Sequence, residues 1–419
     1  MKAPDKDFVR LSVAYGPGNT RGEVLDTWQE YSFENDIFTP CDSFNFRVGL
    51  TSRRGLKAMG KYEIADLRYI TAPDTVVRLE LGEEHDLAAI GIIDDQFEHG
   101  DRTGNWLDLS GRDGMSILQD NDCQMANARI SNTTLPELAA RIVEPYRGKG
   151  IPYGVYADNN SNRDLLTGHK KPLKSRFGEV KPKQIRTSAG VISIFGTGAL
   201  GKNDVPIDFV KLPIEEARPH PGENEYKFLD RHASNLGVMM MMSADGNLIF
   251  FRPDYNQPVT FELRRYLRNK TTQNNILSGG VRRNTANTAT RVKMLGHTSG
   301  KAGAKTQVTA VAQMSESYVF PRTKVVRDGH AKDKPRAQKE ANRALARANT
   351  NLITLEYTMQ GHAQDGLLYA PDTLAHVVDE LCDIDGTYYI TARSIRKSRG
   401  ETLTTLKLVP SGAIVLDYL

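Results

Sequence analysis

The last part of the chain alternates apolar and polar residues with the period of a half-buried β-strand. Residues 353–359 read Ile-Thr-Leu-Glu-Tyr-Thr-Met, which places every second side chain on one face. Apolar runs follow at 374–378, 388–395 and 403–409, with turns expected at Gly386 and Gly400. Successive short antiparallel strands with glycine corners predict a closed barrel or a sandwich rather than a nucleotide-binding sheet.

The first 112 residues show the same kind of pattern. Alternating or apolar runs, each short enough for one strand, occur at 9–15, 28–33, 44–48, 77–81, 88–93 and 106–109. The sequence Gly16-Pro17-Gly18-Asn19 is a clear break between strands. This number of strands is sufficient for a small closed barrel.

The middle of the chain carries helix signals instead. Thr134-Leu135-Pro136-Glu137 has the T-x-x-E spacing of a capping box and precedes apolar residues at helical spacing. A second helix is predicted over 223–236, with Gly237 after its end. Residues 238–252 then predict a hairpin around the Asp245-Gly246 turn, with the run Met239–Met242 in its core. Helix and hairpin together predict a compact α+β unit.

Two other regions differ in composition from their surroundings. Residues 159–186 are polar and basic and predict a surface insertion. After 261, strands are expected at 276–283, 290–296 and 319–326, and a helix at 335–349 with alanines on one face and basic residues on the other. The order along the chain is therefore β-rich, mixed and β-rich again, which predicts a mixed, mainly β fold.

Composition narrows the class of protein. The chain has 419 residues and a net charge of only +4. Its three cysteines, Cys41, Cys123 and Cys382, are far apart, so we expect reduced thiols in a cytosolic product and no structural zinc site. The N-terminus has no apolar signal segment and no apolar run is long enough to span a bilayer, so a soluble product is expected.

One glycine-rich segment satisfies two phosphate-binding patterns. Residues 191–202, which include Gly196, Gly198, Gly201 and Lys202, match G-x-G-x-x-G and most of G-x-x-x-x-G-K. The context fails, because Asn203 replaces the expected Ser or Thr and prolines at 206 and 213 exclude a long helix. We therefore interpret the segment as a turn between strands and predict no cofactor.

No residues with catalytic or metal-binding spacing are found. The histidines are scattered, and the adjacent pairs Asp94-Asp95 and Glu83-Glu84 would point to opposite faces of a strand. The sequence thus predicts no catalytic, cofactor-binding or metal-binding residue, and no enzyme. Basic clusters at 170–186 and 322–347 contain one aromatic residue, Phe177, which favours a solvated surface or an acidic partner protein over nucleic acid.

Several motifs in order along the chain resemble those of one family. They are Gln364-Asp365-Gly366-Leu367-Leu368-Tyr369-Ala370-Pro371-Asp372-Thr373-Leu374, Ile384-Asp385-Gly386-Thr387-Tyr388-Tyr389-Ile390, Gly400-Glu401-Thr402-Leu403-Thr404-Thr405-Leu406, the helix–hairpin after Pro221-Gly222-Glu223, and Ser110-Gly111-Arg112-Asp113. The pattern resembles baseplate hub proteins of contractile-tailed phages, the phage Mu tail P and late control D type, which are related to the N-terminal region of VgrG spikes. Tyr369 stands where the family usually has Trp, and Asp372 where it has Asn.

This resemblance implies a structural protein with two tube-like β-barrels. It assigns residues 1–112 to the first barrel, 113–260 to a middle α+β region with a basic insertion near 159–210, and 261–419 to the second barrel with helix 335–349. Three chains would then form a homotrimeric symmetry adapter between the sixfold tail tube and the threefold spike. Expected partners are the central spike, tail tube or tube-initiator proteins and baseplate wedge proteins.

The resemblance further implies a place in the virion baseplate after assembly in the host cytoplasm, DNA at most in transit, and no membrane insertion. Two alternatives remain open from the residues: a tail-associated cell-wall hydrolase, and a nucleic-acid-binding protein that uses the basic clusters.

Overall fold

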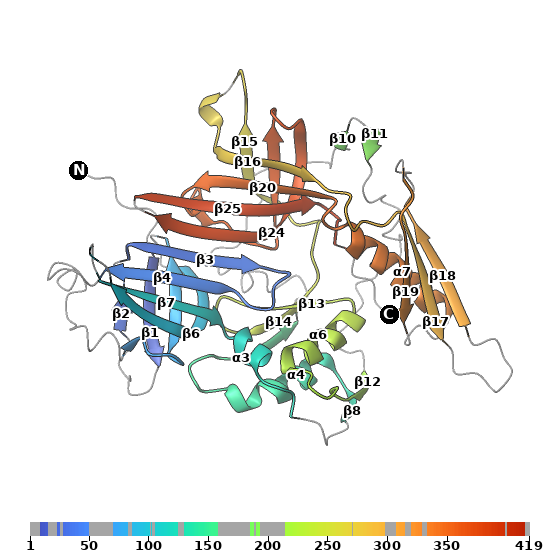
Figure 1. The fold of residues 1–419 in the computed structure, drawn as a ribbon, viewed down its shortest axis with the longest axis horizontal. Helices are drawn as coiled ribbons and strands as arrows, with labels where there is room; N and C mark the ends of the chain where they lie inside the picture. The colour runs from blue at the N-terminus through green and yellow to red at the C-terminus, as the bar shows by residue number, and fades with distance from the viewer. Residues whose placement is uncertain are drawn as a thin grey trace.

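The computed structural model describes most of the chain, and every structural statement below concerns these residues. They are 9–15, 23–25, 28–49, 70–82, 86–100, 102, 105–124, 130–157, 185–187, 190–192, 214–269, 271–297, 307–314, 320–328, 333–398 and 400–414. The fold is mainly β, as the sequence predicts, with helices below and beside one large sheet (Figure 1). Within the described part, no helix has the length and apolarity needed to cross a bilayer.

The first β-rich half consists of seven strands around one core. They are β1 (Val9–Tyr15), β2 (Glu23–Leu25), β3 (Glu30–Asp36), β4 (Ser43–Gly49), β5 (Val76–Leu81), β6 (Asp86–Gly100) and β7 (Asn105–Asp113). Burial alternates along β4 and along β7, so the predicted two-residue period is confirmed. Phe33, Phe44 and Leu107 lie in the shared core.

The second β-rich half surrounds a separate core. Its main strands are β15 (Val259–Arg265), β16 (Ile276–Arg283), β20 (Ile353–Gln360), β23 (Thr373–Asp379), β24 (Ile384–Ser398) and β25 (Glu401–Pro410), with the short hairpin β21 (Ala363–Gln364) and β22 (Leu367–Leu368) between β20 and β23. The turn predicted at Gly386 is wrong, because Gly386 pairs with Val377 inside the ladder and the chain turns before Ile384. Gly400, at φ 107°, does occupy a turn that favours glycine.

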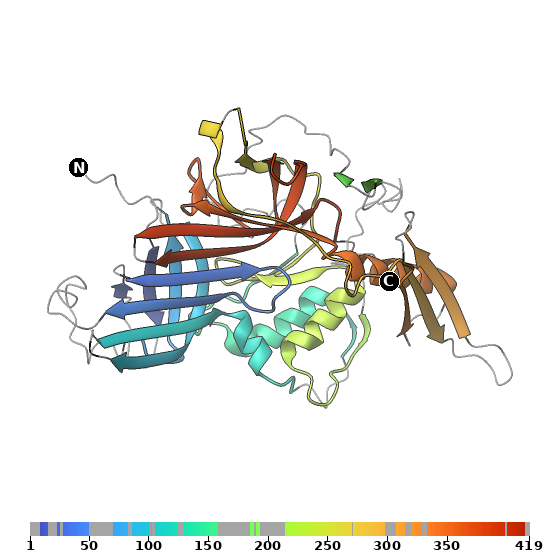
Figure 2. The same cartoon turned by 45° about the horizontal axis from the view of Figure 1, so that its top comes forward.

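The two halves share one sheet. It has 13 strands in the order β16-β20-β25-β24-β3-β4-β7-β6-β5-β1-β2, with β15 and β23 branching from β24. The first part of β24 pairs with β23 and its later part pairs with β3, so this one strand belongs to both halves. Figures 1 and 2 show β24 and β3 side by side. No ladder in the described ranges closes either half, and the two closed barrels stay a prediction.

The middle unit packs its helices beneath the sheet (Figure 2). It contains α3 (Met115–Asp120), β8 (Ile130–Thr133), α4 (Leu135–Val143), the 3-10 helix Glu144–Tyr146, β9 (Val155–Ala157), β12 (Ile214–Ala217), α6 (Glu225–Asn235), β13 (Met239–Met242) and β14 (Leu248–Phe251). The predicted capping box, second helix and hairpin are confirmed. Of the basic insertion, only the small hairpin β10 (Ile185–Thr187) and β11 (Gly190–Ile192) is described.

A further unit, which we call the lobe, is inserted between β16 and β20. It comprises β17 (Arg291–His297), β18 (Gln307–Gln313), β19 (Thr323–Asp328) and α7 (Lys334–Asn349). The predicted helix at 335–349 is confirmed, and its alanine face packs on Met294 and the alanines of β18 rather than on the large sheet. The lobe projects from one end of the molecule (Figure 1). The predicted domain borders at 112 and 260 stay a prediction.

Candidate assembly interface

The acidic, histidine and cysteine side chains of the described residues form no cluster of metal ligands. No group of three or more His, Cys, Asp or Glu side chains in them is placed to hold a metal ion. Asp94 accepts hydrogen bonds from Arg112 at 2.6 and 3.1 Å and is held as an ion-pair partner. Glu83-Glu84 and positions 193–202 of the glycine-rich segment lie outside the described ranges. The Met239–Met242 strand is core, as predicted, with Met240 and Met242 buried.

The seam between the two β-rich halves is a short antiparallel ladder. It runs from Tyr31 opposite Lys397 to Asp36 opposite Ala392. Arg393, only 5% exposed, sits opposite Asn35, and its guanidinium donates to the carbonyl of Tyr369. Burial lowers the pKa of Arg393 to about 10, and the nearby Asp42 carboxylate opposes this shift. A buried arginine therefore lies in the seam, where its guanidinium also stands over the Phe33 ring of β3 at 5.3 Å from the ring centre.

A histidine makes a second buried contact across the seam. His362, 1% exposed, lies in the turn after β20 and its Nε2 is 2.7 Å from the Tyr31 hydroxyl of β3. Its Nδ1 is 3.3 Å from Thr404 Oγ1, and that hydroxyl donates to the carbonyl of Gly361. Because buried polar groups are costly unless they are paired, this network disfavours any other arrangement of the two halves.

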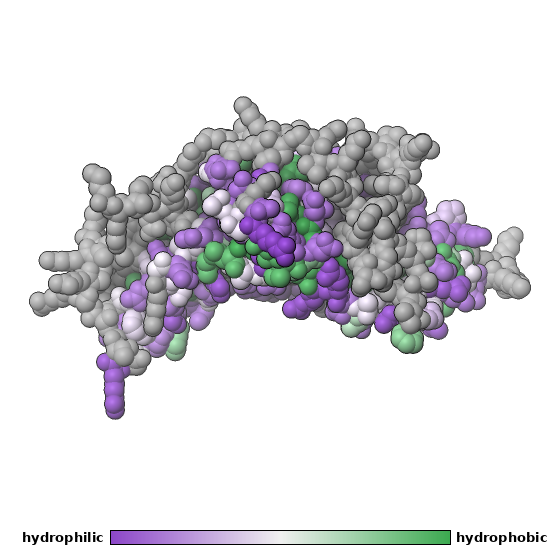
Figure 3. Space-filling model, turned by 90° about the horizontal axis from the view of Figure 1, so that it is seen from above, coloured by the Kyte–Doolittle hydropathy of each residue, from purple (hydrophilic) through white to green (hydrophobic). Residues whose placement is uncertain are grey.

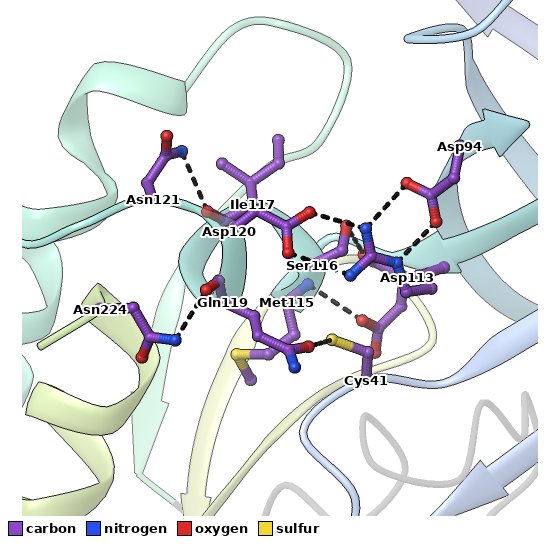
Figure 4. A network of polar contacts seen from close by, with 11 residues as sticks. Cys41, Asp94, Asp113, Met115, Ser116, Ile117, Gln119, Asp120, Asn121 and Asn224 are labelled. Atoms are coloured by element: carbon purple, nitrogen blue, oxygen red, sulfur yellow. Dashed lines mark hydrogen bonds and ion pairs between the residues drawn. The ribbon is translucent and has the colours of Figure 1, made fainter. Parts of the chain in front are cut away.

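The Ser110-Gly111-Arg112-Asp113 motif joins the first half to the helical unit (Figure 4). Hydrogen bonds from Arg112 reach Asp94 of β6 and Asp120 of α3, and they raise the pKa of the arginine. Asp113 is buried and accepts the Met115 amide hydrogen at 3.0 Å, which starts α3. A Cβ on Gly111 would lie 2.2 Å from the carbonyl oxygen of Ile92. Arg112 and Asp113 thus connect the first half to α3, and Gly111 lets β7 approach β6 closely.

Helix α3 is also tied to its other neighbours through Gln119 (Figure 4). The Cys41 thiol, in the turn between β3 and β4, donates to Gln119 Oε1 at 2.9 Å. The Asn224 amide, at the start of α6, donates to the Gln119 carbonyl at 2.7 Å. Burial raises the pKa of the Cys41 thiol, which favours the protonated form that donates this hydrogen bond.

Two stretches of strand have a ladder on one side only in the described residues, and we call them the open edges of the large sheet. In the described ladders β16 pairs only with β20, and the last part of β6, from Asp95 to Gly100, pairs only with β7. Each open edge carries an exposed apolar side chain: Leu277 of β16 is 57% exposed and Phe97 of β6 is 55% exposed. Exposed edges with apolar side chains are surfaces on which another strand can add.

The two open edges carry opposite charges. Arg282 and Arg283 end β16 and are exposed, and Asp95 and Glu98 are exposed on the open part of β6. An antiparallel pairing of the two edges would place the arginine end of β16 near the aspartate end of the open β6 segment. The two edges are therefore complementary in charge, and each is a strand edge that carries an exposed apolar side chain.

A third edge is covered by side chains. On the outer edge of β15, the Glu262 amide donates to Gln364 Oε1 at 2.9 Å and the Arg264 amide donates to Asn275 Oδ1 at 2.7 Å. The amide groups of Gln364 and Asn275 both donate in return to the Glu262 carbonyl. Side-chain amides replace a ladder here, which blocks strand addition. The start of β16 is partly covered as well, because Arg265 of β15 donates to the Gly279 carbonyl at 3.1 Å and the Asn275 backbone amide donates to the Arg264 carbonyl.

One cleft on the described part of the chain has mixed charges. It has a volume of about 730 Å³ and lies between α6, α7 and the outer surface of the second half. Its lining includes Asp230, Glu356, Arg343, Arg347 and Lys407. Burial raises the pKa of Asp230, and the guanidinium groups of Arg347 and Arg343 oppose this shift. Because acidic and basic groups offset one another, the cleft does not select strongly for ligands of one charge.

Sequence reasoning did not identify the seam or the open edges. The apolar run 88–93 predicts a shorter strand, whereas β6 continues to Gly100 through the polar residues that form its open edge. Of the two basic clusters, 322–347 lies in the lobe, and nearly all of 170–186 lies outside the described ranges. The polar residues that follow the apolar run 88–93 were the one signal in the sequence for the edge formed by the end of β6.

Comparisons with known proteins find similarity to tail proteins. Residues 348–412, which span β20 to β25, match a family described as the tail protein C-terminal domain (NMB1110-like). No curated protein sequence matches the chain. The tail protein from Neisseria meningitidis MC58 has a TM-score of 0.68 at 20% identity, with 97% of this chain and 98% of that protein covered.

Two further solved structures have a similar overall fold. The 43 kDa tail protein of prophage MuSo2 from Shewanella oneidensis has a TM-score of 0.69 at 16% identity and covers 98% of this chain and 100% of its own. A chain of the Francisella PdpA–VgrG complex has a TM-score of 0.55 at 10% identity, with 99% of this chain and 60% of that chain covered. The comparisons identify the fold as that of phage tail proteins, and residues 348–412 as similar to a tail protein C-terminal domain.

Proposed function

We propose that this chain is the structural hub of a contractile phage tail baseplate. In this proposal three copies form a symmetry adapter between the sixfold tail tube and the threefold central spike. The support is that one chain holds two β-rich halves, each with its own core, in a single sheet. Three chains would present six such halves, and each half would act as one tube-like barrel.

The observation that carries the proposal is the eight-stranded path between the two open edges. From β16 through β20, β25, β24, β3, β4 and β7 to β6, every neighbouring pair is antiparallel. Because the number of strands is even, β16 of the next copy can continue the alternation beside β6. A head-to-tail contact of this kind closes into a ring when the rotation is one third of a turn.

The remaining parts of the proposal follow from this ring. Its two ends would meet the tube or tube-initiator proteins and the spike, the surrounding proteins would be baseplate wedge proteins, and its place would be the virion tail. DNA would pass through the lumen only in transit. We propose no reaction for the chain itself; zymography on host cell wall tests this, and a lytic band would favour the hydrolase alternative.

The direct test is the oligomeric state of the purified chain. We expect light scattering to give a species of three times the 46.6 kDa chain mass, and electron microscopy to show a threefold ring with a central hole. The measurement is repeated with the spike protein added, because the partner can stabilise a weak ring by mass action. A monomer or a twofold dimer under both conditions would exclude the adapter.

A further inference from the structure

The lobe concentrates positive charge that the rest of the chain lacks. Residues 284–350 contain 13 lysines and arginines but only four acidic residues, whereas the whole chain has a net charge of +4. The remainder of the chain is therefore net negative. Such a strong separation of charge between a small unit and the main body indicates a surface that meets an acidic partner.

The outer face of the lobe sheet has a regular composition. Helix α7 packs on the inner face through Met294 and the alanines, and the ladders place three rows of side chains on the other face. These rows are Gln313, Arg291 and Thr323; Val311, Lys293 and Val325; and Thr309, Leu295 and Arg327. The nine positions hold three cations, three aliphatic residues and three neutral polar residues. No carboxylate and no aromatic ring stands among them.

The strand β19 is the most accessible part of this face. In the described ladders β19 pairs only with β17 and forms an edge of the lobe sheet, which has the order β18-β17-β19. Val325 is 59% exposed, and its neighbours Lys324 and Arg327 are also exposed. At the opposite edge, the Gln338 side chain of α7 donates to the Val311 carbonyl of β18. The helix therefore partly covers β18 and leaves β19 open.

We propose that the β19 edge and the outer face of the lobe bind an extended acidic segment of another protein of the same tail. The segment adds as a strand beside β19 through main-chain hydrogen bonds, its carboxylates pair with Lys293 and Arg327, and its aliphatic residues contact Val325. The identity of the partner as a tail protein rests on the proposed function. The docking itself uses residues outside the two open edges of the large sheet.

The chemistry of the face favours a protein over nucleic acid. Cations that alternate with aliphatic side chains suit a peptide strand, whose own side chains alternate in the same way. Single-stranded nucleic acid is held mainly by stacking on aromatic rings, and the nine positions contain none. Seen from above, the right-hand end of the molecule, where the lobe lies, shows mostly hydrophilic residues with a few hydrophobic ones among them (Figure 3).

The test uses the full chain and a labelled short peptide that alternates glutamate with valine and threonine. Fluorescence anisotropy is measured for the native chain, for Lys293→Glu with Arg327→Glu, and for a control, Lys334→Glu with Lys339→Glu. Both double variants change the net charge equally, but the control residues lie on α7. We expect the first variant to weaken binding by about tenfold or more and the control to change it by less than about twofold.

Three outcomes would overturn the proposal: no peptide binding, equal losses in both variants, or binding of a short DNA duplex in preference to the peptide. Circular dichroism of each variant confirms that it is folded. Light scattering on the same samples separates this proposal from the hub. A trimer without peptide binding removes only the docking proposal, and a monomer that binds the peptide removes only the hub.

Discussion

At the scale of single residues, the carboxylate of Asp379 is buried and paired with Arg265. Its side chain is 0% exposed and accepts hydrogen bonds from Arg265 Nε at 2.8 Å and from the Tyr357 hydroxyl at 2.7 Å. Burial raises the pKa of Asp379, but the hydrogen bonds outweigh this effect and the pKa lies below its ordinary value. The ion pair joins β15 to the end of β23 inside the second half.

Replacement of Asp379 by asparagine should destabilise the chain by about 3 kcal/mol, because Arg265 is left without its charged partner in a largely buried site. The native chain should lose this contribution as the pH falls through the folded pKa of Asp379, and the variant should not. Urea unfolding at several pH values measures both effects. The matched control is Asp94→Asn, whose ion pair is partly exposed and should cost less than about 1 kcal/mol.

A second residue-scale prediction concerns His232 of α6. Burial lowers the pKa of His232 from 6.5 to about 4, and the Arg231 guanidinium adds to this shift, while Glu223 opposes it. The unfolded chain therefore binds a proton at a higher pH than the folded chain. Stability should fall as the pH decreases from about 6.5 towards about 4, by roughly 3 kcal/mol.

The variant His232→Phe tests this assignment. It keeps an aromatic ring against Phe228, which the native imidazole contacts edge-on at 5.0 Å, but it has no group that titrates. Thermal unfolding of the variant should show a weaker pH dependence in this window. An unchanged pH profile would mean that another group controls acid stability.

At the scale of elements, helix α6 depends on the residue that precedes it. Asn224 accepts the Lys227 amide hydrogen at 2.8 Å as the N-cap, and its amide donates to the Gln119 carbonyl. We expect Asn224→Ala to cost about 1–2 kcal/mol in urea unfolding. Asn224→Asp keeps the cap acceptor and loses the donor to α3, so it should cost less. Equal losses would assign the effect to the contact between α3 and α6.

At the scale of the whole molecule, the two open edges of the sheet should determine the ring. If β16 meets β6 of the next copy, Arg283→Glu should abolish the trimer in light scattering, because it brings like charges together near Asp95. Asp95→Arg should act in the same way. The chain with both changes should regain the trimer, since the charges are then exchanged. Failure of this rescue, with each chain folded, would place the interface elsewhere.

The elements that depend on neighbouring residues could be predicted from the sequence. Three such features are visible in the chain: the two-residue alternation of β20, the capping box before α4 and the alanine face of α7. Each depends on residues that are close to one another in the sequence. The error at Gly386 arose because a glycine inside a strand has the same local signal as a glycine in a turn.

The sequence by itself therefore determined the mainly β character, the order of elements, and the resemblance carried by the closing strands. Only the tertiary structure decided that β24 belongs to both halves, that Arg393 and Asn35 meet in the seam, and which strand edges stay open. The physical reason is that strand pairing is a non-local choice. Alternation specifies which face of a strand is buried, but it does not specify which strand lies beside it.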